Sequence, residues 1–166
     1  MLAVTSNIAD TVHVRVEFAP AVLPDDLRRL MAFDRRVFPK ADLFDAAYWR
    51  KCESWWLMVE DVRAGCCAFE RDVDVTVNGE RERAGCAYVA TTGILPLFQG
   101  RGLGRLMKDW QIAWAVHNGF RRLVGVTRKS NRAMIRLNRS CGFREVRTIA
   151  DYYADEAGLA MAIKLR

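Results

Sequence analysis

The sequence lacks the long apolar run that a membrane-spanning helix requires. No stretch approaches the roughly 18–20 consecutive apolar residues that cross a bilayer. The first residues, MLAVTSNIADTVHV, also lack a basic segment followed by an apolar one, which is the pattern of a secretory signal. We therefore expect a cytoplasmic protein with no membrane partner.

Cysteine, histidine and proline are present only in small numbers. The five cysteines are an odd number with no Cys-x-x-Cys pair, and there are two histidines, so we expect reduced, mostly buried thiols and no metal site. The four prolines do not cluster, and there are no repeats, low-complexity stretches or linker-like segments. A chain of 166 residues with this composition is predicted to form one globular domain over residues 1–166.

Positive charge is concentrated in one segment. The whole chain has a net charge of +6, but residues 101–147 hold twelve basic and two acidic residues, which leaves a net −4 on the remainder. By itself this segment suits nucleic acid, an anionic membrane surface or a phosphorylated ligand.

Hydrophobic periodicity switches repeatedly between that of a strand and that of a helix. The order predicts an α/β fold (α+β, three layers) with a mixed, mostly antiparallel seven-stranded sheet and four helices. Asn78-Gly79 favours a tight hairpin turn between two of the strands. The predicted strands cover residues 12–18, 55–60, 64–77, 81–95, 123–127, 144–151 and 158–165, and the predicted helices cover 24–38, 44–49, 102–118 and 131–141.

A glycine-rich turn between a strand and a helix is the most informative motif. Residues 94–107 read ILPLFQGRGLGRLM, with three glycines at alternate positions. Glycine allows a tight turn and a close approach to a ligand, and the start of the helix favours an anion. Neither the nucleotide P-loop nor the dinucleotide fingerprint fits, because there is no Gly-Lys-Ser/Thr and the third glycine of GxGxxG is missing. The remaining pattern is Gln-x-x-Gly-x-Gly, at Gln99, Gly102 and Gly104.

This pattern resembles the acyl-CoA-binding motif of the GCN5-related N-acetyltransferases (GNAT). The segment LVGVTRKSNRAMIRLNRSCGF is similar to the next strand and helix of that family, with Asn131 at the helix start and Gly142-Phe143 after its end. The order of elements is also similar over essentially the whole chain. The resemblance implies a fold of the acyl-CoA N-acyltransferase type, acetyl-CoA as co-substrate and transfer of its acetyl group to a primary amine.

The resemblance also implies where acetyl-CoA binds. Its pyrophosphate would lie on the glycine turn, its pantetheine arm along the end of the preceding strand, and a backbone amide at Leu95 would stabilise the oxyanion. Asn131 would hydrogen-bond the arm, although it is equally suited to cap its helix. Because the basic segment flanks a phosphate loop and has few interleaved aromatic residues, we expect no nucleic-acid partner. The predicted cofactor-binding residues are Gly93, Ile94, Leu95, Gln99, Gly100, Arg101, Gly102, Leu103, Gly104, Arg105, Asn131 and Arg132.

The catalytic side chains depart from the family pattern. Many members carry a tyrosine as thiolate acid where this chain has Asn138, and bacterial ribosomal-protein N-acetyltransferases carry an acid at the position of Val126. Tyr88, Glu70 and Asn138 are the substitutes that the sequence offers as catalytic residues. Each also has a structural interpretation, as a packing aromatic, an exposed carboxylate and a polar helix residue. The alternative function is a catalytically silent domain that binds or senses acyl-CoA.

Two short motifs point to the amine acceptor. Tyr152-Tyr153, between the last two strands, and Phe38-Pro39, between the first two helices, resemble loops that clasp the peptide in protein N-terminal acetyltransferases. The sequence leaves open a peptide N-terminus or a small amine as acceptor, and a monomer or a homodimer as assembly. The net −4 outside the basic segment suits a cationic amine of either kind.

Overall fold

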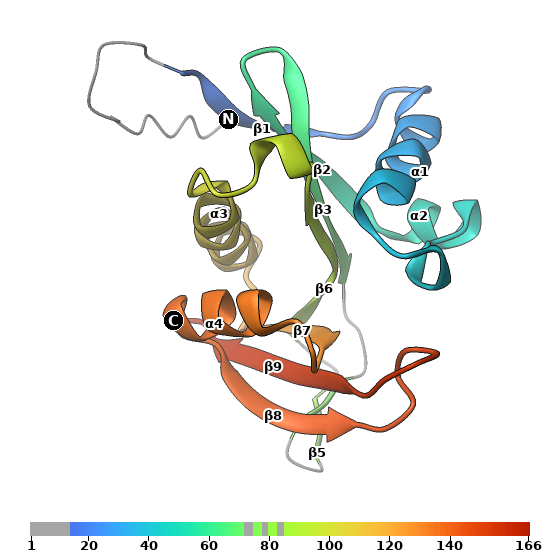
Figure 1. Ribbon diagram of the computed structural model, residues 1–166. Coiled ribbons are helices and arrows are strands. Elements are labelled where there is room, and N and C mark those ends of the chain that lie inside the picture. Colours follow the sequence, from blue (N-terminus) through green and yellow to red (C-terminus); the bar gives the residue numbers. More distant parts are fainter. Residues whose placement is uncertain (1–13, 72–74, 78–79, 83–84) are drawn as a thin grey trace.

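The computed structural model describes residues 14–71, 75–77, 80–82 and 85–166 (Figure 1). A seven-stranded sheet has the order β1-β2-β3-β6-β7-β9-β8, and all neighbours are antiparallel except the parallel pair β6 and β7. The predicted α/β architecture is therefore confirmed. The strands are β1 Val16–Pro20, β2 Glu53–Val59, β3 Val62–Arg71, β4 Val75–Val77, β5 Glu80–Glu82, β6 Cys86–Ile94, β7 Arg122–Arg128, β8 Arg144–Ile149 and β9 Gly158–Lys164; the helices are α1 Asp26–Val37, α2 Ala46–Lys51, α3 Leu103–His117 and α4 Arg132–Ser140, with 3-10 turns η1 Lys40–Asp42 and η2 Pro96–Phe98.

Helices cover both faces of the sheet. Figure 1 shows α1 and α2 on one face and α3 and α4 on the other. The adjacent buried residues Cys66 and Cys67 of β3 illustrate the alternation, because Cys66 belongs to the core under α1 and Cys67 to the core under α3. All five cysteines are free thiols. No helix in the described part of the chain is long and apolar enough to cross a membrane.

Two predicted strands are each divided in the structure. Residues 64–77 were expected to form a single strand that returns over residues 81–95, but β3 ends at Arg71 and β6 begins at Cys86. Between them, β4 and β5 pair only with each other in a separate two-stranded sheet. The alternation of valine and aspartate in this stretch identifies a strand without identifying its partner. The turn predicted at Asn78-Gly79 lies outside the described residues, as does the predicted strand start before residue 14.

The two parallel strands, β6 and β7, diverge halfway along their length. β6 and β7 pair from Cys86–Arg122 to Val89–Gly125, and both strands continue beyond that point without pairing with each other. Ala90 is the extra residue of a bulge in β6, since Val89 pairs with Phe69 of β3 and Thr91 with Ala68. A bulge bends the strand that carries it, so β6 diverges from β7 and leaves an unpaired backbone edge over its last residues.

Candidate functional site

The glycine turn follows the unpaired end of β6 and leads into α3. Gly100 and Gly102 have left-handed φ angles of 74° and 79°, and a Cβ atom built on either would meet nothing within 4 Å. Gly102 is the N-cap of α3, which is 15 residues long. A left-handed turn open to its surroundings at the positive end of a long helix suits an anion such as a pyrophosphate, so these residues fit the expected coenzyme.

The backbone at the end of β6 corrects the expected oxyanion donor. The amide of Leu95 donates to the carbonyl of Ala64 at 2.9 Å, so it is used in pairing with β3. Successive peptide groups of a strand point to opposite edges, which directs the amide of Ile94 to the unpaired edge instead. The carbonyl of Ile94 on that edge accepts a hydrogen bond from Gln99 Nε2 at 2.9 Å. Gln99 thus ties the glycine turn to the end of β6.

The arginines at the turn differ in their surroundings. Arg101 is exposed and its guanidinium lies 5.7 Å from the centre of the Phe98 ring. Arg105 donates from Nε to both carboxylate oxygens of Asp109 at 3.0 Å, and from Nη1 to the carbonyl of Ser140 at 3.3 Å. Arg105 therefore joins α3 to the end of α4, while Arg101 is the more available cation.

At the start of α4, the structure shows the capping role of Asn131. Its side-chain oxygen accepts from the amide of Met134 at 3.0 Å. Asn131 and Arg132 are both exposed. The amide nitrogen of the Asn131 side chain remains available for a ligand, so capping and ligand contact are compatible.

A cluster of hydroxyl groups and one carboxylate lies on the α1–α2 side of the sheet. Glu70 of β3 and Tyr88 of β6 are register partners on adjacent strands. Tyr48 of α2 donates to Glu70, and the hydroxyls of Tyr88 and Tyr152 share a hydrogen bond of 2.6 Å. Burial raises the pKa of Tyr48 and of Tyr88 well above the usual value, so both phenols stay protonated. Of this cluster, Glu70 is the group that can accept a proton.

Asn138 lies apart from that cluster, on the buried side of α4. It is 7% exposed, and its Nδ2 contacts the sulfur of Met161 at 3.6 Å. Its Oδ1 has no hydrogen-bond partner in the described structure. The sequence offers Asn138 as a hydrogen-bond donor to the coenzyme sulfur rather than as a proton donor, and that role stays a prediction.

The loop of residues 38–45 brings Phe38 to the end of β6. A Cβ atom on Gly93 would lie 3.1 Å from the Phe38 ring and 3.0 Å from Val37, so only glycine allows α1 to approach this closely. Pro39 follows as an exposed residue that precedes η1. The 38–45 loop therefore borders the strand end where the sheet opens.

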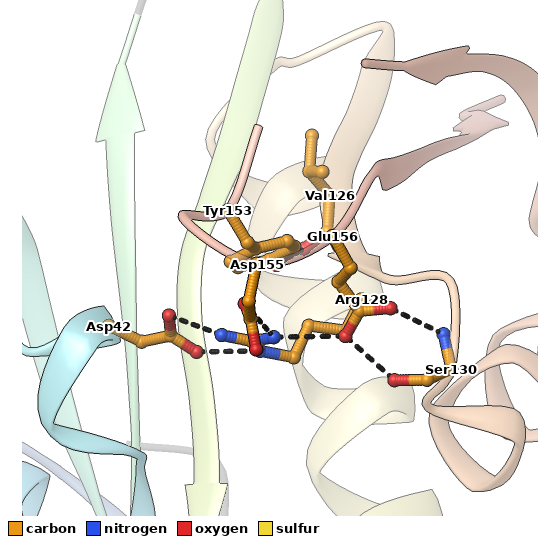
Figure 2. A network of polar contacts seen from close by, with 7 residues as sticks. All are labelled: Asp42, Val126, Arg128, Ser130, Tyr153, Asp155 and Glu156. Carbon is orange, nitrogen blue, oxygen red and sulfur yellow. Dashed lines mark hydrogen bonds and ion pairs between the residues drawn. The ribbon is translucent and has the colours of Figure 1, made fainter. Parts of the chain in front are cut away.

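The loop of residues 150–157, between β8 and β9, reaches the same region. Tyr152 meets Tyr88, as described above, and Tyr153 packs edge-on against Tyr152 with ring centres 5.0 Å apart. Arg128, the last residue of β7, lies between the two loops (Figure 2). It contacts Asp42 of the 38–45 loop and both Asp155 and Glu156 of the 150–157 loop.

A family model for the acetyltransferase (GNAT) family matches residues 25–143. The chain belongs to the GNAT family. A search of curated protein sequences finds no match.

Solved structures of GNAT proteins have the same fold at low sequence identity. The ribosomal-protein-S18-alanine N-acetyltransferase of Escherichia coli is 21% identical, with a TM-score of 0.73 over 90% of this chain and 94% of its own. NAA60 of Arabidopsis thaliana in complex with acetyl-CoA is 16% identical, with a TM-score of 0.75 over 90% and 99%. A Bacillus subtilis acetyltransferase in complex with CoA is 17% identical, with a TM-score of 0.71 over 92% and 99%. Two of these neighbours were therefore solved with the coenzyme bound, CoA in one and acetyl-CoA in the other.

The GNAT fold brings most of the predicted site residues to one region. The glycine turn and the end of β6 lie on one side of the divergence of β6 and β7, and Glu70, Tyr88, Phe38 and Tyr152 lie towards the α1–α2 side. The described residues contain no group of three His, Cys, Asp or Glu side chains that could hold a metal ion.

Sequence reasoning missed three residues of the site. Tyr48 was placed on a short helix without a role, Arg128 was counted only as part of the basic segment, and Asp42 received no role. No local pattern marks these residues, because their partners lie 22 and 86 positions away for Tyr48–Glu70 and Asp42–Arg128.

Proposed function

We propose that this GNAT protein transfers the acetyl group of acetyl-CoA to a primary amine, either a small molecule or the N-terminus of a peptide. The observation that carries the proposal is the joint position of the open glycine turn, the unpaired edge of β6 and the Glu70–Tyr88 pair. Together these would supply an anion-binding turn, an unpaired backbone edge and a proton acceptor along β6 and its neighbour β3. We also propose that residues 1–166 act as a single domain.

Acetyl-CoA supplies a thioester that a neutral amine attacks directly, with release of the CoA thiol. The left-handed turn at Gly100 and Gly102 would bind the pyrophosphate with its backbone amides, with Arg101 adding charge. The remaining cofactor contacts would come from Leu103 and Gly104 in the first turn of α3 and from Asn131 and Arg132 at the start of α4.

The amine must lose a proton to react. The Glu70 carboxylate would accept it, directly or through a water molecule, while the protonated Tyr88 hydroxyl would orient the amine by a hydrogen bond. Tyr48 would hold the Glu70 side chain in place through its own hydrogen bond. In this scheme Tyr88 and Glu70 act on the amine, and Asn138 has no part in that step.

The carbonyl oxygen of the thioester gains negative charge as the amine attacks. The amide of Ile94, which is directed to the unpaired edge of β6, would stabilise that charge in place of the amide of Leu95. No acidic side chain of the described site is placed to protonate the leaving thiolate. Proximity alone supplies effective molarities of up to about 10⁵–10⁸ M in well-oriented systems, so transfer does not depend on such an acid.

The acceptor would be an amine that fits between the 38–45 and 150–157 loops. Phe38 and Pro39 of the 38–45 loop and Tyr152 and Tyr153 of the 150–157 loop would contact the chain that bears the amine. The acceptor would then lie on the α1–α2 face, opposite to α3. This arrangement accommodates a peptide N-terminus or a compact amine.

Two measurements test the proposal. Acetyl-CoA should raise the melting temperature of the protein, and release of CoA thiol should appear with tetra-alanine, which has a free N-terminus, or with spermidine. Absence of any thermal shift with saturating acetyl-CoA contradicts the proposal. A thermal shift without turnover over broad panels of peptides and amines would favour the silent acyl-CoA-binding domain.

A further inference from the structure

Arg128 occupies an unusual place for a residue of the basic segment. It is the last residue of β7, where it pairs with Gly158 of β9, and its side chain is only 17% exposed. Its partners are three carboxylates from two loops that are far apart in the sequence, and one of them, Asp42, lies 86 positions away.

The guanidinium uses its fork geometry on both sides. Towards the 38–45 loop, Nε and Nη2 donate to the two carboxylate oxygens of Asp42 at 2.8 and 2.7 Å. Towards the 150–157 loop, Nη1 donates to Asp155 at 2.6 Å and to Glu156 at 2.9 Å. Figure 2 shows the guanidinium between Asp42 on one side and Glu156 on the other. A planar group with donors in fixed directions can join two loops in this way, whereas a lysine ammonium is a single point charge.

Further contacts fix the same network in place. The guanidinium lies 4.5 Å from the centre of the Tyr153 ring, and the Tyr153 hydroxyl reaches the carbonyl of Val126 at 3.4 Å. Glu156 also accepts from the amide and the hydroxyl of Ser130, at 3.0 and 2.7 Å, just before α4 begins. The 150–157 loop is therefore held across the end of β7.

We infer that Arg128 is a positioning residue that joins the 38–45 and 150–157 loops and so sets the shape of the acceptor site between them. The inference rests on the proposed function in so far as the acceptor binds between these loops. The loops carry Phe38, which packs on Gly93, and Tyr152, which is hydrogen-bonded to Tyr88. Without the cation, three carboxylates would face one another without the positive charge that joins them, and their repulsion would drive the loops apart.

The test compares two substitutions of Arg128 in the full chain. In Arg128→Met, kcat/KM for tetra-alanine or spermidine should fall about tenfold or more through misplacement of the acceptor. The KM for acetyl-CoA should stay within about twofold, because no glycine-turn residue touches the network. Arg128→Lys should restore only part of the loss, since it keeps the charge without the fork. Arg15→Met, which removes the exposed ion pair with Asp61, is the matched control and should leave both constants unchanged.

Hydrogen exchange supplies a readout that does not depend on turnover. In Arg128→Met the amides of both loops should exchange faster, while those of residues 99–104 should not change. If Arg128→Met fails to fold, Asp42→Asn keeps the shape of its partner and should still speed exchange in the 38–45 loop and lower acceptor kcat/KM.

The outcomes separate the inference from the proposed function. Three results in Arg128→Met would each overturn the inference while acetyl transfer stands. The first is unchanged kinetics with the acceptor, the second is a rise in KM for acetyl-CoA as large as the loss in acceptor kcat/KM, and the third is unchanged hydrogen exchange in both loops. If wild-type protein turns over neither amine, acetyl transfer to these acceptors fails, and faster exchange of both loops in Arg128→Met still supports the joining role.

Discussion

Tyr88 and Tyr152 lie 64 positions apart in the chain, and their hydroxyl groups share a hydrogen bond of 2.6 Å. The contact joins the middle of β6 to the 150–157 loop on the α1–α2 face of the sheet. Tyr88 is also the register partner of Glu70, so the residue that contacts the loop and the residue that bears the carboxylate lie side by side on adjacent strands. In the proposed reaction this places a phenol, a carboxylate and the 150–157 loop around one amine.

Removal of the Tyr88 hydroxyl tests whether it contacts the reacting amine. Tyr88→Phe should lower kcat by about tenfold to a hundredfold, because the amine would lose the hydrogen bond that orients it for attack, with KM for acetyl-CoA unchanged. Tyr152→Phe removes the other half of the same hydrogen bond and should raise acceptor KM by about fivefold, the value of one hydrogen bond. Initial rates of thiol release measure both. If both substitutions change the kinetic constants equally and only slightly, Tyr88 is a packing residue that does not contact the amine.

Substitution of Gly102 separates backbone strain from coenzyme binding. Gly102→Ala places a Cβ atom on a residue with φ of 79°, which should cost about 1 kcal/mol in the free energy of unfolding. It should also raise KM for acetyl-CoA, because the turn would relax away from the geometry that seats a phosphate. Gly119→Ala is the matched control, with φ of 77° and equally open surroundings at the other end of α3. Denaturant melts should show similar losses in the free energy of unfolding for both variants. A raised KM for acetyl-CoA in both variants would contradict a special role for Gly102.

The elements with local signals were predictable from the sequence. The glycine turn and α3 follow from backbone freedom and a strand-to-helix change in periodicity within one short stretch, and the cap of α4 follows from an asparagine before an amphipathic run. The order of these elements predicted the mixed sheet and the helices that cover it. Each of these features depends on residues close together in the chain.

The residues of the acceptor side were harder to assign because their partners are distant. Arg128 added to the local excess of positive charge, and only the folded chain brings Asp42 against it. The amide of Leu95 was available by sequence, but its strand pairing with Ala64 takes it out of the site. The charges and amides along a sequence do not indicate which loop or strand will lie opposite them in the folded chain.

Asn131 offers a way to separate helix capping from ligand contact. Asn131→Ser keeps an oxygen that can accept from the Met134 amide, so the free energy of unfolding should change by no more than about 0.5 kcal/mol. It removes the side-chain nitrogen, and a lost hydrogen bond to acetyl-CoA should raise KM about fivefold. Asn131→Ala should lose the cap as well and destabilise by about 1 kcal/mol. An unchanged KM in the stable serine variant would leave Asn131 with the capping role alone.

Lys108 should make the stability of the protein depend on pH in a defined direction. It is 4% exposed on the inner side of α3, with its ammonium 5.5 Å from the centre of the Phe143 ring, and burial lowers its pKa from 10.5 to about 8. Below pH 8 the folded protein holds a buried charge that the unfolded chain keeps in water, which costs about 3 kcal/mol by the difference in pKa. The cost falls as pH rises and vanishes above about 10.5, where both states are neutral.

Lys108→Met should remove that cost while keeping a chain of similar length. The variant should therefore be more stable than the wild type by up to about 3 kcal/mol at pH 7, and the two should converge towards pH 10.5. Urea melts of both proteins at a series of pH values measure the difference, which cancels the titration of the tyrosines and cysteines that the two share. A variant that is less stable at pH 7, or a difference independent of pH, would mean that the ammonium is stabilised by contacts stronger than the Phe143 ring provides.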